Sequence, residues 1–411
     1  MDLFFETRQQ GVILTWDILI NDINNSTTYN PYCKSDSYYE TFKNIITSML
    51  IGEKIILLDS DFTDSELINL TEHSNFSSYT QEIDKKSFPL IQNKRELISN
   101  LRETSKNWKI TLFTSGTTGI PKKVTHNYDS ITRFVKISDR NSDNIWGFAY
   151  NPTHMAGIQV FYQAVLNGNT IIKLFGLTPN EIYREIKENN ITHISATPTF
   201  YRLLLPCDES FQSVRRITSG GEKFNKKTIH QLQDVFPEAK ITNVYATTET
   251  GTLFASNNDI FSIKPEYKNL IRTENDELLI HNSLIGNTNT NINEWYNTGD
   301  LIEIITEDPL RFKFISRKSD MINVGGYKVN PLEVEEAILT IPEIKNVRVF
   351  PKSNSVLGNI ICCEVVCVNE EISESSIRIF LQSKIQEFKI PRIIKFVDEL
   401  STTRTGKIKR T

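Results

Sequence analysis

The sequence predicts an α/β protein with a large N-terminal domain of layered, mainly parallel sheets and helices and a small α+β C-terminal domain. Apolar runs typical of strands alternate with helical runs through most of the 411 residues, and such alternation favours parallel sheet covered by helices. The pattern changes near Ser316. The rest of the chain, roughly 95 residues, is long enough for a separate domain, so we predict domains at residues 1–316 and 317–411.

Four apolar runs in the large domain are predicted to form strands. They lie at residues 53–61, 108–113, 191–197 and 240–246. Helices are predicted at residues 63–72 and 180–190. Thr63 and Glu66 have the spacing of a capping box, in which two side chains satisfy free N–H groups at the start of a helix.

The small domain is predicted to combine three short strands with two helices. The strands lie at residues 346–350, 359–368 and 393–397, and the helices at residues 331–340 and 372–388. Three of the five cysteines, Cys362, Cys363 and Cys367, lie in the middle strand. Because no second Cys or His pair has the spacing of a zinc site, we expect reduced, buried thiols.

The composition is that of an ordinary globular protein, with 39% hydrophobic and 23% charged residues. The formal net charge of −4 gives no overall basic field that would attract nucleic acid. The first residues lack a basic stretch followed by an apolar core, which argues against a secretory signal. No apolar run approaches the roughly 20 residues that span a bilayer. We therefore expect a cytoplasmic protein without a membrane span or a nucleic-acid partner.

The segment at residues 111–124, TLFTSGTTGIPKKV, indicates an anion-binding loop. An apolar strand leads into a turn rich in Gly, Ser and Thr, where glycines let successive backbone N–H groups approach an anion. Hydroxyl and ammonium groups add donors for phosphate. The candidate residues are Thr114, Ser115, Gly116, Thr117, Thr118, Gly119 and Lys122. The spacing is not that of a Walker A loop, and an ordinary surface loop is the alternative.

This loop resembles the phosphate loop of the ANL superfamily of adenylating enzymes, which includes acyl-CoA synthetases, the adenylation domains of peptide synthetases and luciferases. Later segments resemble further signatures of that family in the same order. They are TSGGE at residues 218–222, NVYATTETG at 243–251, WYNTGDLIEI at 295–304, FISRKSDMINVGGYKV at 314–329 and LSTTRTGKIKRT at 400–411. The resemblance extends from about residue 50 to the last residue. It implies the two-domain fold and ATP-dependent formation of an acyl-AMP.

The resemblance places three motifs around the base and phosphates of ATP. Tyr245 would stack on adenine, as an aromatic ring can, and Thr248 would bind the α-phosphate. Glu249 would hold Mg²⁺, because hard carboxylate oxygens suit that ion. The other residues expected at the nucleotide are Gly220, Gly221 and Glu222, in a turn against adenine, and Ala246 and Thr247 beside Tyr245. The family usually has Gly at the position of Ala246.

The ribose site and the hinge are assigned by the same resemblance. Asp300 resembles the carboxylate that accepts hydrogen bonds from the ribose hydroxyls, and Arg317 resembles the ribose-binding arginine at the domain junction. Ser319 or Asp320 would be the hinge about which the mobile small domain swings, and the spacing from Arg317 favours Ser319. The family often has Arg where this chain has Asn297.

Two further assignments lie in the small domain. Gly325 and Gly326 resemble the turn that flanks the tunnel of the thiol, and they would also suit a hairpin turn. Lys407 sits where the family keeps its catalytic lysine, which bridges the substrate carboxylate and the α-phosphate. A basic tail taken alone would be frayed and solvated.

The segment at residues 151–160, NPTHMAGIQV, resembles the part of the family that borders the substrate carboxylate. His154 would gate the acyl pocket or contact the substrate, and the alternative is a packed or capping histidine. Relatives that activate α-amino acids usually show an Asp in this region. Residues 146–159 contain none, so we expect a fatty, hydroxy or aryl acid without an α-amino group.

The predicted function is ATP- and Mg²⁺-dependent activation of a small carboxylic acid, followed by transfer to the thiol of CoA or of phosphopantetheine on a separate acyl carrier protein. The alternatives are an adenylating enzyme with a non-thiol acceptor and a catalytically silent nucleotide-binding homologue. The presence of Glu249, Asp300, Arg317 and Lys407 argues against a silent homologue.

The phosphate loop begins near residue 114, earlier than in typical relatives. An N-terminal layer is therefore expected to be missing or shortened, which would leave the acyl site open or require a homodimer. A compact, open enzyme favours a carrier protein as the acyl acceptor. The basic residues of the small domain that would meet the carrier or CoA are Lys345, Arg348, Lys352, Lys384, Lys389, Arg392 and Lys395.

Overall fold

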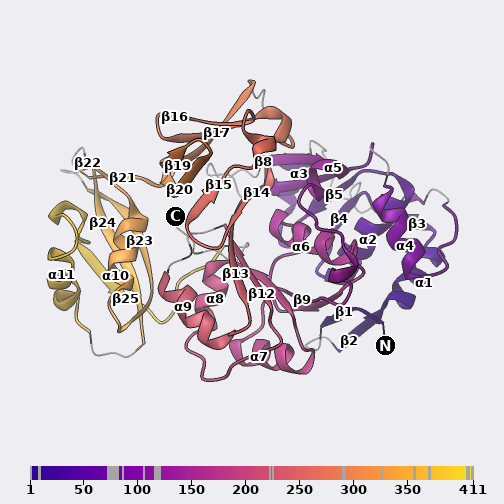
Figure 1. Ribbon diagram of the computed structural model, residues 1–411, viewed down its shortest axis with the longest axis horizontal. Helices are drawn as coiled ribbons and strands as arrows, with labels where there is room; N and C mark the ends of the chain where they lie inside the picture. The colour runs from indigo at the N-terminus through magenta and orange to yellow at the C-terminus, as the bar shows by residue number, and fades with distance from the viewer. Residues whose placement is uncertain are drawn as a thin grey trace.

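The computed structural model describes residues 2–7, 11–71, 83–85, 88–104, 107–114, 122–221, 224, 226–288, 293–324, 327–354, 358–368, 372–403 and 408. Helix α1 (Trp16–Asn25) and helix α11 (Glu374–Gln382) lie toward opposite ends of the longest axis, and the main sheets lie between them (Figure 1).

The largest sheet of the described chain has the mainly parallel character that the sequence predicts. In spatial order its strands are β14 (Gly251–Ser256), β13 (Lys240–Thr247), β12 (Arg216–Gly220), β11 (His193–Ala196), β9 (Ile145–Phe148), β10 (Thr170–Lys173), β1 (Leu3–Thr7) and β2 (Val12–Thr15). The edge strands β14 and β2 run antiparallel to their neighbours, and the other pairs are parallel. The predicted strands at residues 191–197 and 240–246 are confirmed.

Helices cover both faces of this sheet. One face packs on α7 (Pro179–Glu188), α8 (Pro198–Leu203) and α9 (Lys226–Val235), through a core that contains Ile194 and Ile217. The other face packs on α6 (Met155–Val165) and, beyond it, on α1, α2 (Tyr38–Ile51) and α4 (Lys94–Arg102). Because successive strand residues point to opposite faces, Ser195 and Thr218, next to these core residues, turn toward the side of α6.

A second sheet carries the predicted phosphate loop. Its described strands, in spatial order, are β18 (Asn287–Thr288), β8 (Lys122–Asn127), β7 (Lys109–Thr114), β5 (Ile55–Leu58) and β4 (Tyr32–Lys34). Strands β7 and β8 are antiparallel with Thr114 opposite Lys122, and the short helix α5 (Tyr128–Thr132) follows β8. The predicted strands at residues 53–61 and 108–113 correspond to β5 and β7.

Helix α3 (Asp64–Thr71), after β5, begins with the predicted capping box. The backbone N–H of Thr63 donates to the Glu66 carboxylate at 2.8 Å, and the N–H of Glu66 donates to the Thr63 hydroxyl at 3.3 Å. A separate two-stranded ribbon joins β3 (Thr28–Tyr29) to β6 (Ile83–Asp84).

A third, antiparallel sheet lies above the largest one in Figure 1. Its described strands, in spatial order, are β15 (Ile260–Ser262), β20 (Leu310–Arg317), β19 (Trp295–Glu307), β17 (Glu277–His281) and β16 (Ile271–Glu274). The pairing of β19 with β20 sets Asp300 opposite Arg317. Two residues that the motifs single out, seventeen positions apart, therefore become direct cross-strand neighbours.

The small domain has a hydrophobic core of its own. Its strands and first helix are β21 (Ile322–Val324), β22 (Tyr327–Val329), α10 (Pro331–Leu339), β23 (Ile344–Asn354), β24 (Gly358–Cys367) and β25 (Ile393–Phe396). Buried Val334, Cys363 and Leu381 join α10, β24 and α11 in one cluster, whose described members all fall within residues 322–394. This core supports a separate body, and the boundary at residue 316 stays a prediction, with β20 continuing to Arg317.

Two sequence predictions for the small domain have different outcomes. The helix expected at residues 372–388 is shorter, because α11 ends at Gln382 and the chain then turns. Ile385 and Phe388 pack against the core beyond α11, Phe388 within a separate 3₁₀ turn (Glu387–Lys389), so their apolar spacing reflects burial and not a continuous α-helix. All three cysteines of β24 are free thiols, and Cys362 and Cys363 are buried as predicted, whereas Cys367 is only partly buried.

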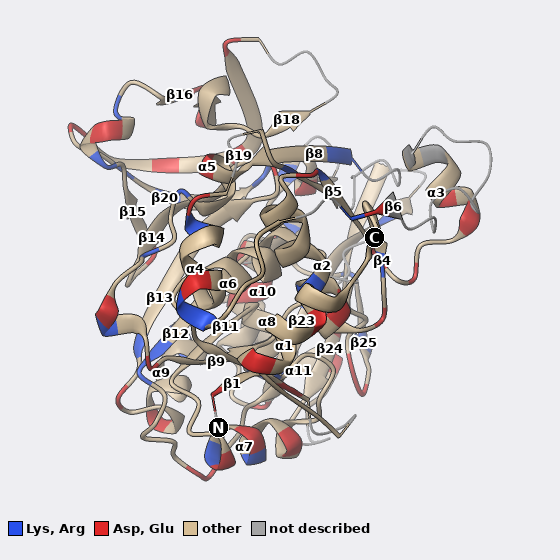
Figure 2. Ribbon diagram, turned by 90° about the vertical axis from the view of Figure 1, so that its right-hand side faces the viewer, with Lys and Arg blue, Asp and Glu red and all other residues tan. Residues whose placement is uncertain are grey.

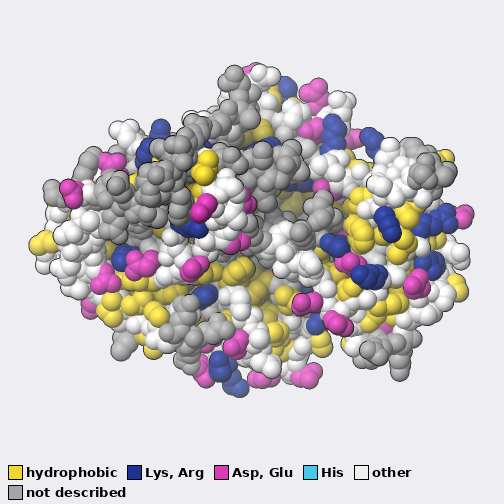
Figure 3. Space-filling view, turned by 180° about the vertical axis from the view of Figure 1, so that it is seen from behind, with side chains coloured by type: hydrophobic (Ala, Val, Ile, Leu, Met, Phe, Trp, Pro, Cys, Tyr) yellow, Lys and Arg dark blue, Asp and Glu magenta, His cyan; other side chains and the backbone are white. Residues whose placement is uncertain are grey.

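The surface carries charges of both signs. Lys and Arg are interspersed with Asp and Glu along the chain in Figure 2, and the face in Figure 3 mixes both with apolar side chains. Within the described residues, we find no helix with the length and apolar character needed to cross a membrane.

Replacement of Cys363 by Ser tests how the small-domain core is held together. Cys363 is fully buried, and a hydroxyl there would lack a partner, so Cys363→Ser should lower the free energy of unfolding by about 1–3 kcal/mol. Cys367→Ser, at a partly exposed site of the same strand, is the matched control and should change it by less than about 0.5 kcal/mol. Urea denaturation measures both, and equal effects would contradict this account of the core.

Candidate active site

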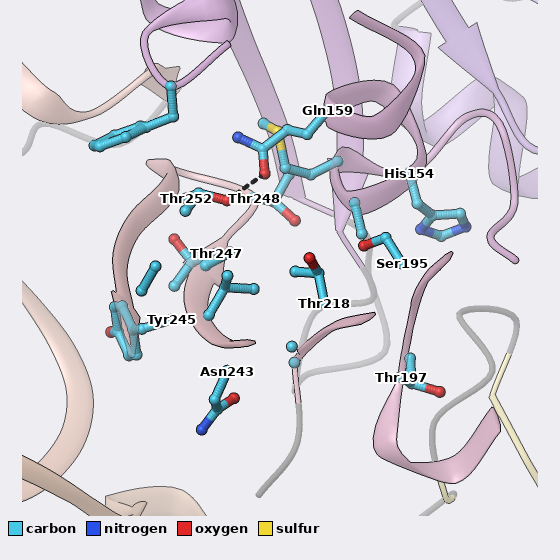
Figure 4. A pocket seen from close by; sticks show the side chains of 18 of the residues that line it. His154, Gln159, Ser195, Thr197, Thr218, Asn243, Tyr245, Thr247, Thr248 and Thr252 are labelled. Atoms are coloured by element: carbon cyan, nitrogen blue, oxygen red, sulfur yellow. Dashed lines mark hydrogen bonds between the residues drawn. The ribbon is translucent and has the colours of Figure 1, made fainter. Parts of the chain in front are cut away.

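A cavity of about 1020 Å³ lies where the largest sheet, the third sheet and the small domain meet (Figure 4). Thr197, Gly220 and Thr247, at the carboxyl ends of β11, β12 and β13, line it. Ligand sites in open α/β sheets form at this edge. The small domain closes the cavity with Leu332, Thr403 and Ile408.

One described residue of the predicted phosphate loop lies at this cavity. Lys122, the exposed first residue of β8, lines the cavity wall. Thr114 ends β7 opposite Lys122, although its side chain lies outside the described part of the structure. Ser115, Gly116, Thr117, Thr118 and Gly119 also lie outside the described residues.

The turn that joins β13 to β14 carries Thr248 and Glu249 into the cavity. His126 of β8 fixes this turn through its Nε2, which lies 2.8 Å from the Thr248 carbonyl oxygen. Because a carbonyl only accepts, Nε2 carries the proton, and burial lowers the pKa of His126, which keeps the ring neutral near pH 7. The N–H of Gly286 donates to the Glu249 carbonyl at 2.7 Å.

Position 286 requires a glycine because the side chains of neighbouring residues lie very close to its Cα. A Cβ at that position would lie 2.6 Å from Cε1 of His126 and 2.9 Å from the Val124 side chain, which is far inside van der Waals contact. The imidazole and the glycine therefore hold the turn from two sides. Neither residue was predicted from the sequence, because neither belongs to the motif that they position.

Gln159 of α6 supports the other side of the turn. Its Oε1 accepts a hydrogen bond from the Thr252 hydroxyl at 2.8 Å (Figure 4). Gly251 adopts a φ of +68°, and a Cβ there would lie 2.6 Å from Nε2 of Gln159. Gly251, the last residue of the motif YATTETG, is therefore needed for two reasons. It adopts a positive φ, and it leaves room for the Gln159 side chain.

Tyr245, Asp300 and Arg317 form one hydrogen-bonded network at the cavity. The Tyr245 hydroxyl donates to Oδ2 of Asp300, and Nε of Arg317 donates to Oδ1 at 2.9 Å. Asp300 is buried. Burial and the adjacent Asp300 carboxylate raise the pKa of Tyr245, so the phenol stays protonated and acts as a donor. A carboxylate offers about four acceptor sites, which leaves two for a ligand.

Glu249 also has a neighbour that the sequence did not indicate. Tyr296 of β19 lines the cavity beside it. Burial, together with the Glu249 carboxylate, raises the pKa of Tyr296 to about 12. A neutral phenol next to a carboxylate favours a hydrogen bond between them, which restricts the carboxylate.

His154 has a carboxylate partner from a distant part of the chain. It precedes α6 as its N-cap residue, and its Nε2 lies 3.1 Å from Oδ2 of Asp59, at the end of β5. The Thr153 hydroxyl donates to the other oxygen of this buried carboxylate. The ring lines the cavity. His154 occupies the N-cap position of α6 without a side-chain cap hydrogen bond, and its predicted role at the acyl pocket stays a prediction.

Some of the remaining motif residues lie at the cavity, and others lie outside the described residues. Gly220 ends β12 at the cavity and Gly221 has a φ of +84°, so the expected glycine turn is present. Ser319 and Asp320 line the cavity within a short 3₁₀ turn. The other candidates, Glu222, Gly325, Gly326 and Lys407, lie outside the described residues. Ala246 and Thr247, on β13, both line the cavity.

Comparison with known families identifies the chain. The family described as "AMP-binding enzyme" matches residues 48–272, and its C-terminal domain, "AMP-binding enzyme C-terminal domain", matches residues 333–407. The chain belongs to the AMP-binding enzyme family. This finding confirms the predicted superfamily.

Similar curated proteins are named as CoA ligases. The 4-hydroxybutyrate–CoA ligase 1 of Metallosphaera sedula is 26% identical over 377 residues, covering 78% of this chain and 66% of that protein. The 2-succinylbenzoate–CoA ligase of Staphylococcus aureus (strain Newman) is 26% identical over 399 residues, covering 88% of this chain and 78% of that protein. The chain thus spans just under two thirds of the first relative.

Solved structures share the fold. The o-succinylbenzoate CoA synthetase (MenE) of Bacillus subtilis, in complex with its acyl-adenylate intermediate, has a TM-score of 0.71 at 17% identity and covers 99% of this chain and 94% of that one. ATP-bound MatB of Rhodopseudomonas palustris has a TM-score of 0.73 at 16% identity, with the same coverage. The predicted fold class, a large α/β domain with a small α+β domain, is therefore confirmed.

His126 should be essential for the geometry of the turn that carries Glu249. His126→Ala removes the donor to the Thr248 carbonyl, which should lower the free energy of unfolding by about 1–3 kcal/mol and reduce ATP–pyrophosphate exchange. His230→Ala, on the exposed side of α9, is the control and should leave both unchanged. Denaturation and exchange assays measure the two effects, and a His126→Ala enzyme with normal exchange would show that the turn needs no such support.

Proposed function

We propose that this member of the AMP-binding enzyme family is an AMP-forming ligase that joins a small carboxylic acid without an α-amino group to CoA. The observation that carries the proposal is the convergence of separate motifs on one cavity. Lys122, Glu249, Asp300 and Arg317, far apart in the sequence, all line it. Both the curated relatives described above are named as CoA ligases.

The nucleoside of ATP binds between the glycine turn and the third sheet. Tyr245 and Gly220 flank the adenine, and the ribose hydroxyls donate to Asp300. The network supports this role, because Tyr245 and Arg317 fix the carboxylate and leave it acceptor sites. Charge-assisted hydrogen bonds of this kind are stronger than neutral ones.

The phosphates bind along residues 114–119 with Lys122 and Thr248. Glu249 holds Mg²⁺, which supplies positive charge to the phosphate oxygens when it is bound. The described residues contain no cluster of three or more potential metal ligands, so protein oxygens alone would not enclose the ion. One carboxylate with substrate phosphates and water is a usual magnesium environment, and Glu249 fits it.

In the first step, an oxygen of the substrate carboxylate bonds to the α-phosphorus while the bond to pyrophosphate breaks. Two anions must approach each other, so positioning and fixed positive charge dominate catalysis. Lys407 supplies one such charge. Thr403 and Ile408 line the cavity, and a β-bridge joins Thr402 to Ile408. The chain on either side of Lys407 therefore meets the cavity, which supports this role.

In the second step, the thiol attacks the acyl carbonyl carbon and AMP leaves with the electron pair of the broken bond. The small domain rotates about Ser319 or Asp320 between the steps, which withdraws Lys407, while Gly325 and Gly326 flank the path of the thiol. Its separate core supports such a motion, because compact bodies joined by a short hinge can move as units.

CoA is favoured over a carrier protein as the acceptor. The support for CoA is that the curated relatives described above are named as CoA ligases. Two of the seven basic residues considered for CoA or a carrier are paired within the small domain, since Arg348 contacts Glu364 at 2.8 Å and Lys389 contacts Glu333 at 2.7 Å, which reduces the positive charge available to either acceptor. The carrier protein that the sequence suggested as the acceptor stays a prediction without support. The suggested homodimer likewise stays a prediction.

Lys407→Ala should separate the two steps. Loss of one positive contact to the developing charge costs roughly 3–4 kcal/mol, so ATP–pyrophosphate exchange should fall at least about a hundredfold. Transfer from supplied acyl-AMP to CoA should persist. Lys409→Ala, two residues along the same tail, is the matched control and should retain exchange. Normal exchange by the Lys407→Ala enzyme would refute the assignment.

The acceptor is tested by competition between thiols. Purified enzyme with acid and ATP should form acyl-CoA, and a phosphopantetheinylated carrier protein should accept acyl groups far more slowly. Formation of thioester is followed by mass spectrometry of both products. Efficient loading of a carrier with no acyl-CoA would overturn the preference for CoA and leave the adenylating step intact.

A further inference from the structure

Part of the cavity wall is a row of hydroxyl groups on the largest sheet. The parallel register sets Ser195 of β11 level with Thr218 of β12, and Thr218 level with Thr242 of β13. All three line the cavity, on the face of the sheet that packs on α6. We call Ser195, Thr218 and Thr242 the hydroxyl row.

Helix α6 lines the same cavity nearer the turn that carries Thr248, where side chains of Met155 and Gln159 lie within 4 Å of a Cβ placed at Gly251. Met155 and Gln159, at positions i and i+4 on one helix face, line the same cavity. The Thr252 hydroxyl donates to Oε1 of Gln159, which leaves the Nε2 amide protons of Gln159 as donors. Figure 4 shows Gln159, Ser195 and Thr218 around the same space.

Several polar side chains of the cavity wall have no hydrogen-bond partner among the described residues. The side-chain hydroxyls of Ser195 and Thr218 and the Nε2 of Gln159 have no hydrogen-bond partner there, and Thr242 has a long contact of 3.4 Å to Asn257. A purely aliphatic chain would displace water from these groups without replacing its hydrogen bonds. The cost is about 1–3 kcal/mol for each group left unsatisfied. A fatty acid is therefore a poor match for this wall.

Formal charges are absent from the described side chains of this part of the wall. Arg216 and His193 lie one pleat farther along the strands, level with each other, and Arg216 is exposed. Burial lowers the pKa of His193 to about 4, so its ring is neutral near pH 7. Arg216 also lines the cavity but is exposed and is not level with the hydroxyl row, so a carboxylate buried directly against the row would have no cation beside it, which is costly. The wall instead suits an uncharged oxygen.

We propose that the acid activated by this enzyme carries an uncharged oxygen substituent, a hydroxyl or keto group, that binds Ser195 and Thr218. The inference rests on the ligase function proposed above and specifies its substrate class. Thr242 and Ala246 are four residues apart on β13, roughly 13 Å along the strand. The substituent thus lies toward the far end of the acid from the carboxylate, which reacts near Thr248.

The test measures ATP–pyrophosphate exchange with matched acids. Octanoic, decanoic and dodecanoic acids, whose extended chains approach that distance along β13, are compared with their terminal hydroxy and keto counterparts and with the dicarboxylic acids of equal length. For at least one length, kcat/KM for the hydroxy or keto acid should exceed that of the unsubstituted acid roughly tenfold or more, as expected when a site is built to hydrogen-bond its substrate.

Variants connect that preference to the wall. Ser195→Ala and Thr218→Val remove hydroxyls with little change of volume, and each should reduce the preference for the substituted acid while exchange with the unsubstituted acid is kept or raised. A structural defect would lower both. Ser219→Ala is the matched control, because Ser219 neighbours Thr218 on β12, is fully buried and does not line the cavity. It should leave the preference unchanged.

The outcomes separate this inference from the function on which it rests. If none of the acids supports ATP–pyrophosphate exchange, the proposed ligase function is refuted. Exchange in which unsubstituted acids are equal or better at every length, or a preference that survives in both variants, would refute the substrate class alone. A preference for dicarboxylic acids that is lost in Arg216→Ala would also refute it, since the distal group would then be an anion.

Discussion

The buried carboxylate of Asp300 is the interaction on which the site depends. It lies in the third sheet, accepts from Tyr245 of the largest sheet and pairs with Arg317 at the edge of the small domain. A buried charge is tolerated only when it is paired and hydrogen-bonded, and removal of one partner leaves a cost of several kcal/mol. This requirement fixes the two sheets relative to one another, from β13 to the last residue of β20, and the cavity lies where they meet.

The sequence predicts the layers of this fold well where local signals are strong. Residues 55–58 of β5 form a continuous apolar run and are all buried, and the capping box at Thr63 sets the start of α3 as its spacing requires. The end of α11 was predicted poorly. Ile385 and Phe388 keep an apolar spacing because they cover the same core, and burial alone does not distinguish a helix from a packed turn.

The site could be predicted only as far as its motifs extend. Glu249, Asp300 and Arg317 follow from recognisable segments, whereas His126 and Asp59 lie in segments with no signal of their own. Asp59 ends a strand with a residue common in turns, and its proximity to His154 arises from the packing of β5 beside α6. Such pairs depend on tertiary structure, which a single sequence does not reveal. For the same reason the motifs did not indicate the hydroxyl row, which exists only through the register of three strands.

The contact between Gly286 and His126 has a consequence for how the chain can vary. Any side chain at position 286 would enter the space of the imidazole, and a smaller residue at position 126 would remove the donor to the Thr248 carbonyl. Substitution at one position therefore changes what is acceptable at the other. We therefore expect the two positions to vary together, although one belongs to β8 and the other precedes the short edge strand β18 that pairs with it.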